Sequence, residues 1–228
     1  MFPTTRRSVI AALASDDDEQ RRRGFDTFVA LYWKPLYKYL RVARGRDVAD
    51  AEDLTQSFLA KCFENSSLAE YDTAKASFRT FLRMLFDRFV ANEVKASLRQ
   101  KRGGGSVQLD VVDAEGEIAR DHDRSGSPED YFQREWARSV FALAVTHLRE
   151  ESDPTRFAIF EAYDLDDSSR ATYRQTGERF GISETSVTNG LSAMRRRFRA
   201  IVLDVLREAT ASEAEYRAEV RSLLGVEA

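Results

Sequence analysis

The stretch from Tyr173 to Val202, YRQTGERFGISETSVTNGLSAMRRRFRAIV, constrains the fold more than any other part of the chain. A short helical pattern stops at Gly181, because glycine enters the left-handed backbone region without steric cost. A second pattern starts at Ser183, whose hydroxyl suits a helix N-cap. Its apolar residues recur at steps of three and four, so one face of this helix is expected to be buried. They are Val187, Leu191, Met194, Phe198 and Ile201.

The remaining face of the second helix carries short polar side chains first and arginines later. This order is typical of the recognition helix of a helix-turn-helix protein, which enters the major groove of DNA. Gly177, four residues before Gly181, would let the two helices cross closely. The alternative is a plain helical hairpin with a solvated basic surface. The candidate DNA contacts are Ser183, Thr185, Ser186, Thr188, Asn189, Arg195, Arg196 and Arg197.

The composition limits the class of protein. A chain of 228 residues can bury a real core in one or two domains, and its formal net charge of −3 means that DNA affinity must come from local clusters. Four prolines and few glycines favour an all-helical fold. The single cysteine, Cys62, excludes an internal disulfide framework, and no apolar run reaches the roughly 20 residues of a membrane span. With no signal peptide at its start, we expect a cytoplasmic protein.

An acidic patch opens the helical pattern of residues 48–64. Apolar residues can face inward there, which leaves Asp50, Glu52, Asp53 and Gln56 toward solvent. The patch suits docking to a basic partner, a metal or acid–base site, or an ordinary solvated helix start. Catalysis would need convergent partners, whereas the only histidines, His122 and His147, lie in distant settings. We therefore predict no catalytic residue, no metal and no cofactor.

A basic helix is predicted from Ser77 to Arg102. It combines a broad aromatic and aliphatic face with many more basic than acidic side chains. Such a helix could bind phosphates and stack the bases of single-stranded DNA. The alternative is a buried aromatic stripe beneath ordinary surface arginines. The candidate contacts are Arg83, Arg88, Asn92, Lys95 and Arg99.

A glycine triplet, Gly103 to Gly105, is expected to end this helix. The sequence after it is acidic and poor in large apolar residues. Such a stretch cannot bury enough surface to fold alone, so we predict a flexible linker. The expected organisation is an N-terminal extension (1–23), a helical domain (24–103), an acidic linker (104–130), a second helical domain with the helix-turn-helix (131–209) and a C-terminal tail (210–228).

Taken together and in this order, these features resemble a bacterial RNA polymerase sigma factor of the extracytoplasmic-function (ECF) type. The resemblance covers about Gly24 to Arg207. It is carried by DAEDLTQSF at Asp50 to Phe58, by FRTFL at Phe78 to Leu82, by the acidic linker and by the helix-turn-helix segment.

The resemblance implies a non-enzymatic transcription initiation factor. The acidic patch would dock on the clamp of the polymerase core, and the basic helix would melt and read the −10 promoter element as a single strand. The helix that begins at Ser183 would enter the major groove of the −35 element, and its domain would also contact the polymerase flap. Family members often have a tryptophan in the melting helix, where this chain has Phe81 and Phe89, so the residue that captures a flipped base stays open.

Members of this family are controlled by an anti-sigma factor or, in some branches, by a Ser/Thr kinase that acts near the clamp-binding helix. The second mode makes Thr55 a candidate phosphosite, because phosphate beside Asp53 would strengthen an acidic docking face. The sequence leaves two alternative functions open. One is a stand-alone helix-turn-helix regulator that binds duplex operator DNA without polymerase, and the more distant one is a two-metal nuclease.

Overall fold

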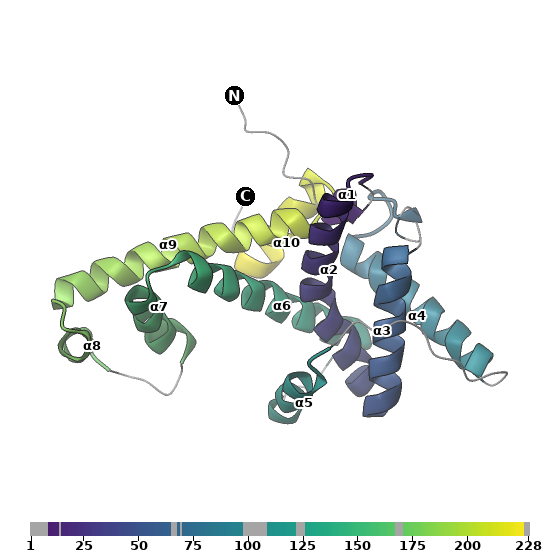
Figure 1. The fold of residues 1–228 in the computed structure, drawn as a ribbon, viewed down its shortest axis with the longest axis horizontal. Coiled ribbons are helices and arrows are strands. Elements are labelled where there is room, and N and C mark those ends of the chain that lie inside the picture. The colour runs from purple at the N-terminus through teal and green to yellow at the C-terminus, as the bar shows by residue number, and fades with distance from the viewer. Residues whose placement is uncertain are drawn as a thin grey trace. The chain divides into compact units, whose positions relative to one another are not determined.

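The computed structural model describes residues 9–13, 15–64, 68, 70–97, 109–121, 126–166 and 171–225 (Figure 1). Every regular element within these ranges is helical, which confirms the expected all-α class. The chain divides into two compact units, unit 1 being Met1–Ser139 with Leu206–Ala228 and unit 2 being Val140–Val205. The boundaries fall within helices α6 (Pro128–Glu151) and α9 (Glu184–Ala209), so each of these helices contributes to both units.

These units do not coincide with the expected domains. Residues 131–139, expected at the start of the second domain, belong to unit 1, and so does the tail 210–228. No helix among the described ranges combines the length and the apolar character needed to cross a membrane.

Unit 1 is built around an aromatic core. The rings of Phe28 and Tyr32 lie 5.3 Å apart, Tyr32 meets the edge of Phe78 at 5.8 Å, and Phe58 lies 4.8 Å from Phe86. Such offset and edge-on pairs add to the stabilisation from apolar burial. The helices that supply this unit, besides parts of α6 and α9, are α1 (Val9–Leu13), α2 (Asp18–Lys38) with its π-helical continuation η1 (Tyr39–Ala43), α3 (Val48–Glu64), α4 (Phe78–Ser97), α5 (Val111–Arg120) and α10 (Glu213–Leu224).

Unit 2 contains the remaining parts of α6 and α9 with α7 (Pro154–Phe160), the π-helical turn η3 (Glu161–Leu165) and α8 (Tyr173–Phe180). Its core is the apolar stripe that the spacing of α9 predicts. Val187, Leu191, Met194 and Ile201 are buried, and the centroid of the half-buried Phe198 ring lies 6.3 Å from that of Phe141 and 5.6 Å from that of Phe160.

Helix α5 lies in the segment that the sequence predicts to be a flexible linker, so this part of the expectation is wrong. Asp110 caps the helix by accepting the backbone N–H of Asp113, and Ala114 and Ile118 are buried. The acidic side chains of α5 form ion pairs with α2 and η1, Lys34 with Asp113 at 2.5 Å and Arg41 with Glu115 at 2.6 Å. The prediction failed because those partners lie far away in the sequence. Residues 104–108 and 122–125 of the expected linker lie outside the described ranges.

Candidate nucleic-acid interface

The turn between α8 and α9 is held by specific backbone contacts. Helix α8 starts with a capping box, in which Thr172 and Gln175 each accept the other's backbone N–H. It ends at Gly181, whose φ of +67° lies in the left-handed region. The N–H of Ile182 then donates to the carbonyl of Gly177 at 2.9 Å. A Cβ on Gly177 would come within 2.6 Å of the carbonyl oxygen of Ile182, so this close approach requires glycine.

The start of α9 uses several of its own hydroxyl groups. Ser183 accepts the N–H of Ser186 at 3.1 Å, as expected for an N-cap, and the two hydroxyls are 2.8 Å apart. The Thr188 hydroxyl donates to the carbonyl of Glu184 at 3.1 Å. Thr185 and Asn189 are exposed, and their side chains form no hydrogen bond with any residue that the structure describes.

The arginines of α9 fall into two groups. Arg195 binds the carboxylate of Asp164 through Nε and Nη2, at 2.8–3.0 Å, and this hydrogen bonding raises the pKa of Arg195. Arg197 donates from Nε to Glu151 at 2.9 Å. Arg196 and Arg199 are exposed and form no ion pair with any residue that the structure describes. Two of the three arginines expected to contact DNA therefore hold α9 against its own unit.

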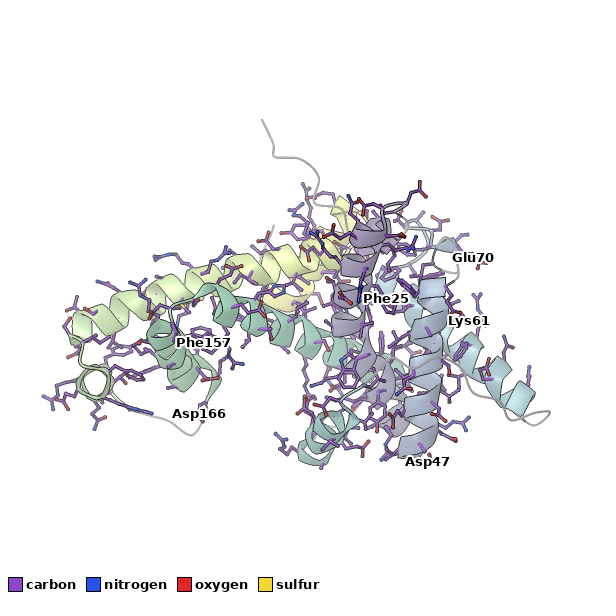
Figure 2. The ribbon with its side chains drawn as sticks, in the orientation of Figure 1. Phe25, Asp47, Lys61, Glu70, Phe157 and Asp166 are labelled. Carbon is purple, nitrogen blue, oxygen red and sulfur yellow. The ribbon has the colours of Figure 1, made fainter. Side chains whose placement is uncertain are left out.

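The acidic patch occupies the first half of α3, the helix that Figure 2 marks with Asp47 at its start and Lys61 toward its other end. Asp50 and Asp53 are exposed, as expected. Glu52 and Gln56 are half-buried, and the Gln56 amide donates to the Glu52 carboxylate at 3.0 Å. The two aspartates are therefore the exposed carboxylates of this patch, and that of Asp50 lies 3.8 Å from the guanidinium of Arg46.

Thr55 lies in the core of unit 1, and this contradicts its prediction as a phosphosite. Its exposed fraction is 0%, and its hydroxyl has no hydrogen-bond partner within the described residues. A kinase needs an accessible hydroxyl, and a phosphate at this position would bring nearly two negative charges into an apolar core. The sequence did contain a signal for this burial, since Thr55 follows Ala51 by one helical turn on the inward face.

Only some of the residues of α4 that are expected to contact DNA are exposed. Arg88, Asn92 and Lys95 are exposed. Arg83 is engaged instead, because its side chain is 12% exposed and its guanidinium pairs with Asp87 and Glu129, each at 2.9 Å. Arg99 lies outside the described residues.

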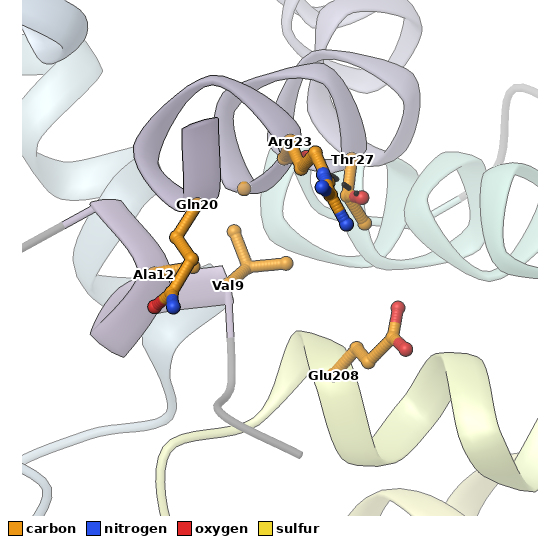
Figure 3. Close-up of a pocket in the computed structure, with 7 residues that line it drawn as sticks. Val9, Ala12, Gln20, Arg23, Thr27 and Glu208 are labelled. Carbon is orange, nitrogen blue, oxygen red and sulfur yellow. Dashed lines mark hydrogen bonds between the residues drawn. The ribbon is translucent and has the colours of Figure 1, made fainter. Parts of the chain in front are cut away.

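None of these candidate residues lines the surface pocket of about 460 Å³ that Figure 3 shows. It is lined by Val9, Ala12, Gln20, Arg23, Gly24, Thr27 and Glu208. Within the described part of the chain, no group of three or more histidine, cysteine or carboxylate side chains is arranged to hold a metal ion.

No family model, curated protein or solved structure matches this chain. Its function must therefore be inferred from the residues and their geometry. Sequence reasoning did not predict that two carboxylates of α10, those of Glu215 and Glu219, contact the first turn of α4. A local signal did exist for the helix itself, since Ser212 followed by Glu215 is a typical N-terminal pattern.

Proposed function

We propose that this protein is a sigma factor that binds the core of bacterial RNA polymerase and directs transcription from promoters with −10 and −35 elements. The observation that carries the proposal is the exposed polar face of α9. This helix buries its apolar stripe, begins at a turn that Gly177 and Gly181 make possible, and leaves Thr185, Asn189 and Arg196 open. A helix with these properties suits the major groove.

Unit 1 supports the proposed contacts with the polymerase core and with the −10 element. Its α3 helix offers Asp50 and Asp53 to a basic partner, and its α4 helix offers Arg88, Asn92 and Lys95 to a nucleic acid backbone or to unstacked bases. In the sigma resemblance these are the surfaces for the polymerase clamp and the −10 element. Dividing promoter contacts between tethered modules raises the effective concentration of each module without requiring either to bind tightly.

The test is a pull-down of purified protein with bacterial core polymerase. We expect the wild type to bind and Asp50→Lys/Asp53→Lys to lose binding. The matched control is Glu64→Lys/Glu70→Lys, which makes the same charge change at exposed positions of the same unit and should bind normally. Thermal unfolding of all three proteins establishes that each is folded. Equal binding by the three would move the docking site away from α3.

The second candidate is a stand-alone regulator, because the same α9 face would also suit an operator. It predicts specific binding to duplex DNA by the protein alone and no binding to polymerase core. Folded wild-type protein that fails to bind core yet selects one duplex sequence would favour the regulator.

A further inference from the structure

Helix α9 has one stripe that points directly away from its core. Successive residues of an α-helix are rotated by about 100°, so the side opposite Val187, Leu191 and Met194 is occupied by residues at steps of four, three and four. These are Thr185, Asn189, Ser192 and Arg196, all of them exposed. The stripe is thus free to face a ligand along about three turns of the helix.

The flanks of the stripe are held by contacts within unit 2. Ser186 is tied to the cap at Ser183, and Thr188 donates to a backbone carbonyl. On opposite flanks of the stripe, Arg195 pairs with Asp164 and Arg197 pairs with Glu151. These contacts fix the rotation of α9 about its axis, which determines the side chains that face outward.

We propose that Asn189 reads an adenine of the DNA duplex in the major groove, with Arg196 on an adjacent phosphate. The proposal rests on the proposed function and adds the base that the site selects. An asparagine amide carries both a donor and an acceptor, and in a bidentate contact it donates to N7 of adenine and accepts from its N6 amino group. Asn189 is the stripe residue with this capacity in the first two turns of α9, where recognition helices contact base edges.

Charge supports duplex DNA as the ligand. Arg196 follows Asn189 on the stripe by seven residues, or about 10 Å at the rise of an α-helix. Exposed Arg199 lies at its edge. The adjoining α8 adds exposed Arg179 and exposed Arg174, whose Nε lies 3.9 Å from the Glu178 carboxylate. These positive side chains surround the amide of Asn189. In such an arrangement, contacts with phosphates position the protein and contacts with base edges provide selectivity.

The experiment is selection from a promoter library in which the −35 region is randomised, by holoenzyme assembled with the full-length protein. The wild type should enrich an A·T pair at one position. Asn189→Ala should reduce the preference for that pair about tenfold while preferences elsewhere persist, as expected on loss of one bidentate base contact. The control Thr146→Ala, a change of similar size at an exposed position on α6 of the same unit, should keep the wild-type preference.

A chemical substitution isolates the contact. Replacing the selected adenine by 7-deazaadenine removes the N7 acceptor, so it should weaken the wild type severalfold and leave Asn189→Ala unaffected. Enrichment by the wild type with an unchanged preference in Asn189→Ala would overturn this inference and leave the proposed function intact.

The same selection, carried out with the protein alone on duplex DNA, tests the alternative that the protein is a stand-alone regulator. If that binding also loses one adenine preference in Asn189→Ala, the base contact holds although the sigma proposal fails. If neither holoenzyme nor free protein selects any sequence, both are overturned.

Discussion

The carboxylate of Glu215 accepts the backbone N–H of Phe78, with 2.6 Å between oxygen and nitrogen. Phe78 is the first residue of α4, and the first N–H groups of a helix have no partner within it. The same carboxylate accepts from the Tyr71 hydroxyl at 3.2 Å and from the N–H of Ala211 at 2.9 Å. The C-terminal helix α10 is therefore part of the structure that supports α4.

Glu215→Ala should lower the free energy of unfolding of unit 1 by about 2 kcal/mol, because it removes a charged acceptor shared by three donors. The measurement is urea denaturation followed by circular dichroism. The control is Glu213→Ala, whose exposed pairs with Arg207 and Arg217 should contribute less than about 1 kcal/mol. Equal effects of the two substitutions would mean that Glu215 does not cap α4.

Lys38 and Glu135 form an ion pair at 2.6 Å with both side chains 2% exposed. Lys38→Met should destabilise the protein by about 3–5 kcal/mol, since it leaves Glu135 and the neighbouring Glu117 without this cation. The control Lys75→Met removes the charge of a side chain that is 82% exposed and should cost less than about 1 kcal/mol. Denaturant midpoints measure both, and a small effect of Lys38→Met would show that solvent reaches the pair.

The contact of α5 with α2 and η1 should weaken in acid. Hydrogen bonding to Lys34 lowers the pKa of Asp113, and hydrogen bonding to Arg41 lowers the pKa of Glu115. Burial alone would raise the pKa of Glu117, but its bonds to Lys34 and Lys38 outweigh burial and lower it.

A carboxyl group with a lowered folded pKa stabilises the folded state above its unfolded pKa of about 4, and this contribution is lost as pH falls through the folded value. Hydrogen exchange of the α5 amides, corrected for intrinsic rates, should therefore show protection at pH 7 that declines below about pH 4. The amides of α8, whose start is held by the neutral Thr172–Gln175 capping box, serve as the comparison. A pH-independent difference between the two helices would contradict the role of these ion pairs.

Two glycines of unit 2 should respond to alanine in opposite directions. Gly177→Ala brings its Cβ to 2.6 Å from the Ile182 carbonyl oxygen and should cost about 1–3 kcal/mol by displacing the turn. Gly190→Ala places its Cβ in open space within α9 and should stabilise the helix by about 0.5–1 kcal/mol. Thermal unfolding tests the pair, and tolerance of alanine at Gly177 would mean that the close approach is not needed.

Thr55 provides a test of burial in unit 1. Thr55→Val replaces an unpartnered buried hydroxyl by a methyl group of similar shape and should leave stability unchanged or raise it by about 1 kcal/mol. Thr55→Glu should lower stability by several kcal/mol, because it buries a carboxyl group in the core. Similar melting temperatures for the Glu and Val variants would show that position 55 is accessible.

Local patterns were sufficient for the all-helical class, for the buried face of α9 and for the end of α8. The spacing of Val187, Leu191 and Met194 identified the buried face of α9, and Gly181 identified the end of α8. These features were predictable because helix periodicity, capping and left-handed glycine depend on residues within one or two turns. The all-helical class follows from the same short-range rules.

Only the tertiary structure decided which charged and polar side chains remain available. Arg83 meets Glu129, Arg195 meets Asp164, and Glu215 meets the first turn of α4, although each pair is far apart in the sequence. The burial of Thr55 and the folding of α5 likewise depend on neighbouring helices. Hydrophobic spacing shows that a helix has a buried face, but the partners of its polar groups are chosen by the packing of the whole unit.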